Sequence, residues 1–397
     1  MNRAELASLS ELRRFYRAQL VDDLAAFWLR HSLDREYGGY LTMLQRDGTA
    51  HGTSKYTWPQ ARGAYMFAKL YNEVAPREAW LEAARLGAEF VDRYAIWDER
   101  AFFQCTRDGR PLSMRDDSFA ESFAVIAFAH FARAAGEQAY LDKARDLFAA
   151  ILRRLDAGEL EAHLHTKLYR EHAPGMILIN CAQELRTVDP DPRYTERILK
   201  WVEDELYVYA NAQHQALFER VGLDGQPVLT EPEGRSITPG HGMESAWFCL
   251  EEGLAQDDRR IVDRAVDVIR WTIARGWDAE QGGVFNFVDC LSKPPGHHDE
   301  GWGEDQDWDA KIFWPHAEAL YALLLAYLVS GDQALWQWYV KVHTYTFAHF
   351  SDPEYGGWFG YLRRDGTVSQ SLKGAMKGFF HIPRAMLKCM QALERYG

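Results

Sequence analysis

Histidine and acidic side chains occur at helical spacing in one segment of the chain. In Thr238-Pro-Gly-His-Gly-Met-Glu-Ser-Ala-Trp247, the residues His241, Glu244 and Trp247 are spaced by three. Residues three or four apart lie on the same face of a helix. The proline near the start favours a helix that begins just before His241. The segment therefore predicts a helix whose first turns present a histidine, a carboxylate and an indole together.

Three further segments offer chemically capable side chains in a similar setting. Trp314 and Glu318 are four apart in Trp-Pro-His-Ala-Glu, and His381 lies in Phe-Phe-His-Ile-Pro-Arg ahead of a predicted helix. Arg62 follows Trp-Pro-Gln-Ala. The candidate residues are thus His241 and His381 for acid–base chemistry, with Arg62, Glu244, Trp247, Trp314 and Glu318 for substrate binding.

Two histidines and an arginine suit proton transfer at a carbon next to a carbonyl group. A histidine with a pKa of about 6.5 can give or take a proton near neutral pH. An arginine keeps its charge and can stabilise a developing oxyanion. If one histidine removes a proton and the other returns it to the opposite face, the carbon is inverted. Return to the neighbouring carbon gives an isomerase instead.

Other functions remain open on these residues alone. Glu244 and Glu318 could flank a glycosidic bond, as the two carboxylates of a glycoside hydrolase do. That interpretation leaves both histidines without a leading role. A non-catalytic helical scaffold is a further alternative, because a single histidine is more often structural than catalytic. Recurrence of such residues at equivalent places in a repeat would favour a shared site.

A recurring phrase shows that such a repeat exists. Asp34-Arg-Glu-Tyr-Gly-Gly and a later Arg-Asp-Gly-Thr reappear as Asp352-Pro-Glu-Tyr-Gly-Gly and Arg-Asp-Gly-Thr. Weaker copies start near 98, 214 and 278, and the gap of 116 residues between 98 and 214 predicts a degenerate copy near Asp156. The chain therefore divides into six units of roughly 60 residues.

Each unit predicts a hairpin followed by two helices. Apolar residues alternate before Asp-Gly, which is a strong hairpin signal, and the remaining residues recur at helical spacing. We expect an all-α fold, an (α/α)6 barrel or toroid with short β-hairpins at one end, in one catalytic domain over residues 1–397. Closure is favoured over an open solenoid because the first and last copies are the most alike.

The repeat places the candidate residues at one recurring distance. Arg62 lies 28 residues beyond the start of its copy, His241 lies 27 beyond and His381 lies 29 beyond. Glu318 lies 40 beyond, because the loop from Ser292 to Asp309 lengthens its unit. Glu121 lies 23 beyond its start. Since one helix of each pair lines the inner wall of a toroid, we expect these side chains to face a common cavity.

Composition limits the partners. The 397 residues carry a net charge of −13, which disfavours nucleic acid and anionic membranes as partners. No apolar run approaches the 18 residues of a membrane span. Five unclustered cysteines and a polar start without a signal peptide predict buried thiols and a cytoplasmic location.

Metal and nucleotide motifs are weak or missing. His163-Leu-His165 and His297-His298-Asp-Glu300 have ligand types but lack helical His-x3-His spacing, so we expect no metal. Neither a Gly-x4-Gly-Lys-Ser/Thr loop nor a Gly-x-Gly-x-x-Gly motif occurs, and a Gly-x-Ser-x-Gly elbow is also lacking.

Four segments together carry a resemblance to a known family. They are Lys55-Tyr-Thr-Trp-Pro-Gln-Ala-Arg62, Pro239-Gly-His-Gly-Met-Glu-Ser-Ala-Trp247, Trp308 through Glu318, and Asp352 through Arg384. With these segments the chain resembles, over nearly its whole length, the N-acylglucosamine 2-epimerase family, which includes cellobiose 2-epimerases and mannose isomerases.

The resemblance implies an (α/α)6 barrel and a cofactor-free proton transfer at carbon 2 of a ring-opened monosaccharide. It implies that His241 and His381 are the acid–base pair, that Arg62 stabilises the enediolate, and that Glu244 and Glu318 support the histidines and the sugar. Trp247 and Trp314 would face the sugar. N-Acylglucosamine and N-acylmannosamine are the expected substrates, mannose-type sugars and an aldose–ketose isomerase are the alternative, and a homodimer is left open.

Overall fold

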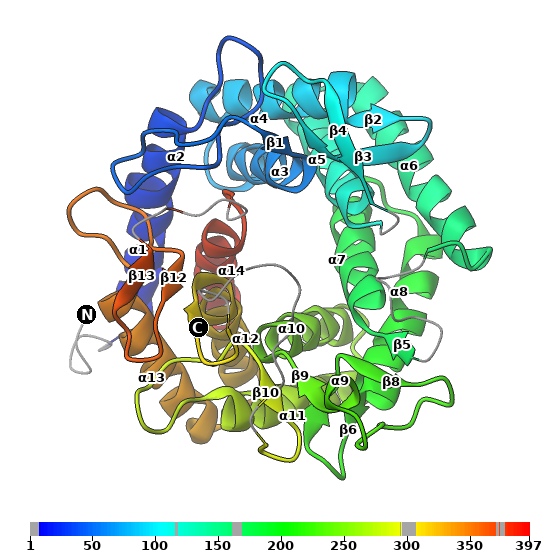
Figure 1. Cartoon of the computed structure of the whole chain (residues 1–397), viewed down its shortest axis with the longest axis vertical. Helices are drawn as coiled ribbons and strands as arrows, with labels where there is room; N and C mark the ends of the chain where they lie inside the picture. Colours follow the sequence, from blue (N-terminus) through cyan, green and yellow to red (C-terminus); the bar gives the residue numbers. More distant parts are fainter. Residues whose placement is uncertain are drawn as a thin grey trace.

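Among the described residues, six helix pairs form a closed ring around a central axis (Figure 1). The computed structural model describes residues 8–115, 118–160, 169–293, 295, 307–370, 373 and 378–397. The inner helices are α3 (Thr57–Glu73), α5 (Phe119–Ala135), α7 (Ala173–Val188), α10 (Pro239–Ala255), α12 (Phe313–Ser330) and α14 (His381–Tyr396). The outer helices are α1 (Leu9–Ala18), α2 (Ala25–His31), α4 (Glu78–Phe90), α6 (Gln138–Asp156), α8 (Pro192–Asp204), α11 (Arg259–Gly276) and α13 (Gln333–His349).

The ring is closed by the two ends of the chain. Each inner helix from α3 to α12 packs against the outer helix that follows it, whereas α14 packs against α1. The last inner helix and the first outer helix therefore form one pair. Phe379, just before α14, stacks on Phe67 of α3 with ring centroids 4.6 Å apart, which joins the last inner helix to the first. These contacts confirm the predicted toroid.

Burial explains which helices lie inside. In α12 every residue from Phe313 to Ala326 is buried except Trp314, because the helix is covered by its inner neighbours and by α13. A helix that is apolar on nearly all sides belongs in the interior. In α11, by contrast, the buried residues recur at three and four, as in Ile261, Ala265 and Ile269, and the other face is solvated. Three π-helical turns extend the outer helices: η1 (Gln19–Leu24), η2 (Val91–Ala95) and η3 (Glu205–Tyr209).

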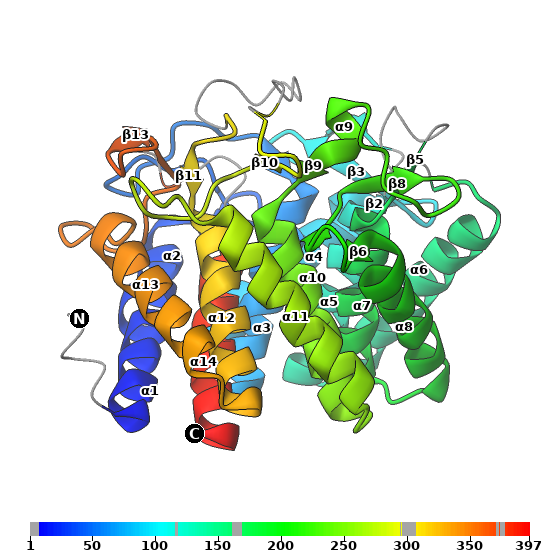
Figure 2. The same ribbon diagram turned by 90° about the horizontal axis from the view of Figure 1, so that it is seen from below.

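The strands gather at one end of the ring, where the inner helices begin (Figure 2). They are short, and the one short helix α9 (Pro232–Arg235) lies among them. The strands are β1 (Lys55–Tyr56), β2 (Ile96–Trp97), β3 (Arg100–Cys105), β4 (Pro111–Met114), β5 (Tyr169–Glu171), β6 (Ala210–Asn211), β7 (Ala216–Leu217), β8 (Arg220–Gly222), β9 (Ser236–Ile237), β10 (Val288–Asp289), β11 (Lys311–Ile312), β12 (Tyr361–Leu362) and β13 (Val368–Gln370).

Among the described residues, strand pairing joins four of the units to the unit that follows. The short strand that leads into an inner helix pairs antiparallel with a strand of the following unit: β1 with β3, β5 with β8, β9 with β10, and β11 with β12. At the ring closure, the Lys373 amide donates to the Leu44 carbonyl over 2.9 Å. Two of the predicted hairpins form regular strand pairs, β2 with β3 and β6 with β7. In two others, Leu33 pairs with Tyr40 and Trp277 with Val284 only through isolated bridges.

Residues of the repeated phrase form a buried ionic staple, a set of one aspartate, one lysine and one arginine, between neighbouring units. Its aspartate accepts from a lysine of the same unit and from the arginine of the next unit's Arg-Asp-Gly turn. Lys55 Nζ lies 2.9 Å from Asp34 Oδ2, and Arg107 Nε lies 2.9 Å from the same oxygen. The corresponding sets are Asp278 with Lys311 and Arg364, and Asp352 with Lys373 and Arg46.

These staples are inaccessible to water at their centre. The side chains of Asp34 and Lys55 are both fully buried. Burial alone would raise the pKa of Asp34, but hydrogen bonds from Arg107 and Lys55 hold it at about 2. Two glycines let the loop close around the lysine, since Gly38 and Gly39 both have positive φ and the Gly38 carbonyl accepts from Lys55.

The degenerate third unit is confirmed as a helix pair, α7 with α8. Asp156 is the last residue of α6 instead of the start of a hairpin, and residues 161–168, which include His163 and His165, lie outside the described residues. His297, His298 and Glu300 also lie outside them. No helix in the described ranges is both long enough and apolar enough to cross a membrane.

We predict that Lys55→Met lowers the free energy of unfolding by about 3–5 kcal/mol, because it leaves the buried Asp34 charge with one partner fewer. Urea unfolding followed by circular dichroism measures the change. Arg13→Met is the control, since Arg13 and Glu394 form a pair between α1 and α14 that is about half exposed. Its loss should be below about 1 kcal/mol. Equal losses in the two variants would contradict a structural role for the staple.

Candidate active site

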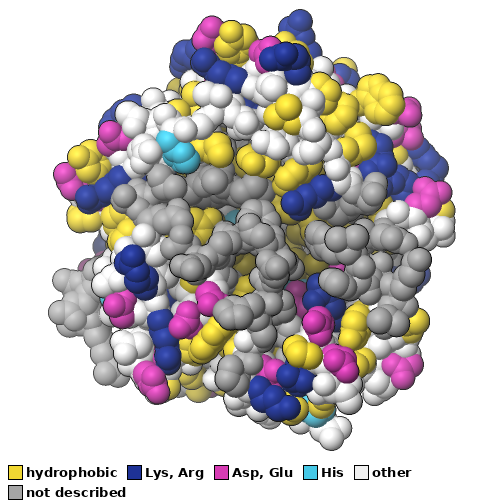
Figure 3. Space-filling view, in the orientation of Figure 1, with side chains coloured by type: hydrophobic (Ala, Val, Ile, Leu, Met, Phe, Trp, Pro, Cys, Tyr) yellow, Lys and Arg dark blue, Asp and Glu magenta, His cyan; other side chains and the backbone are white. Residues whose placement is uncertain are grey.

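The predicted site residues meet at the hairpin end of the ring, near the starts of four inner helices. Arg62 lies in the second turn of α3, His241 in the first turn of α10, Trp314 in the first turn of α12, and His381 is the first residue of α14. Figure 3 looks onto this end, where hydrophobic side chains are visible between charged ones.

Trp314 contacts both histidines. Its ring centroid is 5.2 Å from that of His241 and 5.6 Å from that of His381. The two imidazole rings are therefore within about 11 Å of each other. Gly240 makes this possible, because a Cβ there would meet the Trp314 ring at 2.3 Å.

His381 is held by a carboxylate and an arginine. Its Nδ1 lies 2.7 Å from Glu318 Oε1 and 4.0 Å from Glu244 Oε1. Arg384 Nη2 also donates to Glu318 Oε1 over 2.7 Å and to Glu244 Oε1. Burial lowers the pKa of His381 well below its usual range, with the charge of Glu244 opposing and those of Arg62 and Arg384 adding to the effect. His381 is therefore neutral at pH 7.

His241 is held in a similar way by a second set of groups. Its Nδ1 lies 3.1 Å from Glu219 Oε2, and Glu219 Oε1 lies 3.3 Å from His172 Nε2. His172 Nδ1 in turn lies 3.2 Å from Glu205 Oε2, which also accepts from Ser245 Oγ over 2.6 Å. Burial alone would lower the pKa of His172, but Glu219 and Glu205 raise it to about 10. His172 is thus a cation behind Glu219.

These contacts fix the tautomer of both candidate bases. A carboxylate accepts hydrogen bonds, so the nitrogen beside it carries the proton. With Nδ1–H donated to Glu318 in one case and Glu219 in the other, Nε2 of each neutral imidazole has the free lone pair. The carboxylate also stabilises the imidazolium that forms when Nε2 accepts a proton. Both histidines are therefore arranged as general bases and, once protonated, as general acids.

Arg62 supplies a cation with unused hydrogen-bonding capacity. It is 9% exposed and lies on the faces of Phe123 and Phe380, with its Cζ 4.0 and 4.6 Å from the ring centroids. Burial lowers the pKa of Arg62 to about 9, which leaves it charged at pH 7. Its Nε has no hydrogen-bond partner among the described residues. A buried donor of this kind is suited to an anionic oxygen of a bound molecule.

Two of the residues expected near the cavity are held by other groups of the chain. Trp247 is 1% exposed and donates from Nε1 to Glu318 Oε2 over 2.8 Å, so it supports a carboxylate. Glu121 accepts from the Ala101 amide and pairs with Arg100 and Arg154 at the wall of the barrel. The repeat distance places Glu121 near a helix start, but its carboxylate connects a hairpin to an outer helix.

Two groups of residues have metal-ligand types. His172, Glu219 and His241 form one, and Glu244, Glu318 and His381 form the other. In the second group Arg384 already bonds both carboxylates, and in the first group the high pKa of His172 makes it a cation. The negative charges are thus matched by cations of the chain itself, so neither donor set favours a divalent ion.

Sequence reasoning missed three partners of the histidines: Arg384, Glu219 and His172. Arg384 carried a signal, because it lies three residues after His381 at the spacing of one helix face. His172 precedes α7 in the degenerate third unit, where the repeat offers no measure of distance. Glu219 lies between β7 and β8, in a copy that has lost the aspartate and the paired glycines.

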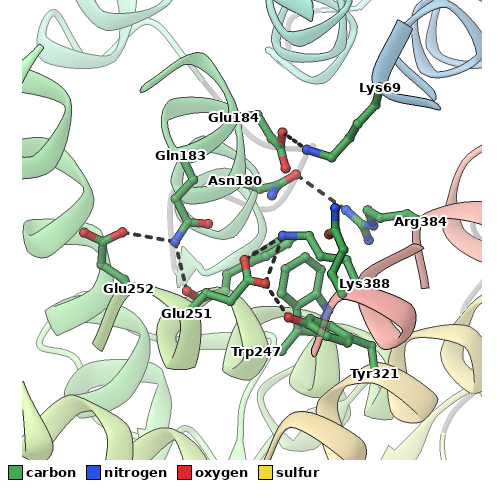
Figure 4. A network of polar contacts seen from close by, with 12 residues as sticks. Lys69, Asn180, Gln183, Glu184, Trp247, Glu251, Glu252, Tyr321, Arg384 and Lys388 are labelled. Carbon is green, nitrogen blue, oxygen red and sulfur yellow. Dashed lines mark hydrogen bonds and ion pairs between the residues drawn. The ribbon is translucent and has the colours of Figure 1, made fainter. Parts of the chain in front are cut away.

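A second polar network continues below the site, toward the other end of the barrel (Figure 4). Lys69 of α3 bonds Glu184 of α7 over 2.7 Å, and Lys388 of α14 bonds Glu251 of α10 over 2.8 Å. Asn180 Oδ1 lies 3.5 Å from Arg384 Nη1 and connects the two layers. The lumen is thus lined by paired charges below the histidines, and these pairs hold inner helices at fixed distances.

Comparison with known proteins finds sugar epimerases and isomerases. A model of the family described as N-acylglucosamine 2-epimerase (GlcNAc 2-epimerase) matches residues 38–385. The N-acylglucosamine 2-epimerase of Mus musculus is 36% identical over 388 residues, covering 94% of this chain and 90% of that protein. The D-mannose isomerase of Marinomonas mediterranea is 19% identical, over 94% of this chain and 96% of that protein. The structure of the cellobiose 2-epimerase from Spirochaeta thermophila covers 99% of both chains with a TM-score of 0.83 at 21% identity.

We predict that His172 remains protonated throughout the neutral range. Folded and unfolded pKa values of about 10 and about 6.5 mean that its charge stabilises the fold fully below pH 6.5, and that this contribution is lost as the pH rises toward 10. Carbon-13 NMR of labelled histidine, with His172→Gln for assignment, should show no titration of His172 between pH 6 and 8. A midpoint inside that range would contradict the charge arrangement around Glu219.

Proposed function

The chain belongs to the N-acylglucosamine 2-epimerase family and is an isomerase, and from this premise we propose that it interconverts N-acylglucosamine and N-acylmannosamine. The reaction moves the proton on carbon 2 of the open-chain sugar. The observation that carries the proposal is the matched pair of histidines, each with Nδ1 on a carboxylate and each in contact with Trp314.

The proposed reaction proceeds in two proton transfers. Nε2 of one histidine takes the proton from carbon 2, the electron pair forms a double bond between carbons 1 and 2, and the carbonyl oxygen becomes an oxyanion. Arg62 stabilises this oxyanion with its buried charge and its free Nε. The other histidine, in its protonated form, then donates a proton to the opposite face of carbon 2. The carbonyl re-forms, and the configuration at carbon 2 is inverted.

The pair can run the reaction in both directions. At the end of a turnover the histidine that began as base is protonated, and the one that began as acid is neutral. The reverse reaction starts from that state. Glu318 and Glu219 stabilise the imidazolium form of His381 and His241 respectively, so each histidine can fill either role.

The neighbouring residues have distinct proposed roles. Trp314 is half-buried beside the histidines and provides an apolar surface for the sugar ring. Glu318 and Glu244 act mainly on His381 and its surroundings. Trp247 acts on Glu318. We also propose that the protein needs no cofactor, works in the cytoplasm, can form a homodimer, and does not bind nucleic acid.

The buried cysteines support an intracellular, reducing location. All five are free thiols with buried side chains. Burial raises the pKa of Cys181 and Cys389, which makes these thiols unreactive. Such cysteines behave as small apolar residues of the core.

We predict that His241→Ala and His381→Ala each lower epimerisation by about 10²–10⁴-fold, because each removes one acid–base group. The measurement is NMR in D2O with N-acetylglucosamine, N-acetylmannosamine and mannose in separate samples. Deuterium at carbon 2 reports the proton transfer, and the product reports the substrate. His214→Ala, on the β6–β7 hairpin, is the control and should retain activity.

Each outcome of that experiment has a distinct meaning. An N-acylated carbon 2 cannot become a ketone, so a ketose product from mannose would favour the aldose–ketose isomerase. Retained epimerisation in either histidine variant would refute the two-base assignment. No exchange with any free sugar would favour a hydrolase.

A second prediction separates the two tryptophans. Trp247→Phe should lower kcat by about three- to tenfold with little change in KM, because it removes one hydrogen bond to Glu318 and no sugar contact. Trp314→Ala should raise KM by about tenfold or more, because it removes the surface beside the histidines. Steady-state kinetics on both epimers measures the difference. An increase in KM for Trp247→Phe alone would place that indole against the substrate after all.

A further inference from the structure

Arg384 is the group that connects the two carboxylates beside His381. It follows His381 by three residues on α14, and its Nη2 bonds Glu318 Oε1 over 2.7 Å and also bonds Glu244 Oε1. Glu318 Oε1 is the same oxygen that accepts from His381 Nδ1. A single carboxylate oxygen is therefore shared between the candidate base and the guanidinium.

Arg384 cannot reach a substrate itself. Its side chain is 2% exposed, and its Cζ lies 4.4 Å from the Phe380 ring centroid and 5.1 Å from that of Trp247. Figure 4 shows Arg384 reaching from α14 toward Asn180. Any effect on catalysis must therefore pass through the groups it bonds.

Charged or titratable groups from four inner helices face His381. Two are anions: Glu318 of α12, at 2.7 Å from Nδ1, and Glu244 of α10, at 4.0 Å. The others are Arg62 of α3, Arg384 of α14 and the second histidine, His241 of α10. Of the two arginines, only Arg384 has hydrogen bonds to the anions among the described residues.

Two carboxylates this close favour the imidazolium form of a histidine and so oppose the effect of burial on His381. An imidazolium cannot accept the proton from carbon 2. On the basis of the proposed function, we propose that Arg384 is a positioning residue that offsets the charges of Glu244 and Glu318, and so keeps His381 a neutral base with Nε2 directed at the substrate. Its contribution is to the protonation state and orientation of His381 and not to substrate binding.

The other histidine supports this interpretation. Behind Glu219, the carboxylate that holds His241, lies a second buried cation, His172. Each candidate base is therefore followed by a carboxylate and then by a buried cation. The groups around His381 and those around His241 come from different helices and differ in residue type. What they share is the order histidine, carboxylate, buried cation.

The test is the titration of His381 in a set of charge variants. Carbon-13 NMR of labelled histidine follows His381, with His381→Gln for assignment, and needs no substrate. In Arg384→Met the midpoint should rise by about one to three pH units, the range for loss of one charge at this distance. Arg384→Lys keeps the charge and should titrate close to the wild-type protein.

A matched pair of variants distinguishes charge from simple packing. Glu244→Gln removes one anion, and Arg384→Met combined with Glu244→Gln removes one anion and one cation. The combined variant should bring the midpoint of His381 back toward the wild-type value. If Arg384→Met alone does not fold, the rise between Glu244→Gln and the combined variant provides the same measurement. An unchanged midpoint in these comparisons would overturn the proposal.

The pH dependence of kcat gives a second measure. A general base works above its pKa, so the acid limb of the profile should move to higher pH in Arg384→Met, with KM little changed. Wild-type exchange of the carbon 2 proton in D2O is measured first. Without that exchange the proposed function fails. With that exchange and an unmoved acid limb, only the role of Arg384 fails.

Discussion

The buried aspartate–lysine–arginine staple is the interaction on which the geometry of the ring depends. Three copies join neighbouring units, at Asp34, Asp278 and Asp352, and the last of them uses Arg46 to join the final unit to the first. A buried ion pair contributes little net stability, but breaking it is costly, which makes it suited to fixing one arrangement over others. The staples lie just ahead of the inner helices, so they determine where those helices start.

The staple also explains why a repeat distance locates the site. Arg62 lies seven residues after the staple lysine Lys55, and Glu318 lies seven after Lys311. His381 lies eight after Lys373. The long loop from 292 to 309 separates Asp278 from Lys311 by 33 residues instead of 21, yet the distance from lysine to site is kept. The buried lysine therefore sets the number of residues to the site residue of its unit, whereas the number of residues from the aspartate changes with the length of the loop.

The sequence predicted the ring, its six helix pairs and its main candidate residues. These features depend on local patterns: the repeated phrase, helical periodicity and a nearly constant unit length. Contacts between side chains of different elements could not be predicted in this way. Glu219 contacts His241 of its own unit and His172 of the third unit, and no sequence pattern records these contacts. The resemblance implies that Trp247 faces the sugar, whereas its indole donates to the buried Glu318. Helical spacing gives a face of a helix and not the depth in the lumen.

The two bases are built from the same sequence of charges but differ in their access to water. The His241 side chain is 30% exposed, whereas that of His381 is 9% exposed. In an epimerase each histidine must hold a proton in one direction and lack it in the other. A carboxylate alone would favour the imidazolium, and burial alone would favour the neutral ring. At His381, burial and the buried cation Arg384 oppose the charge of Glu318 and the second negative charge of Glu244 beside it.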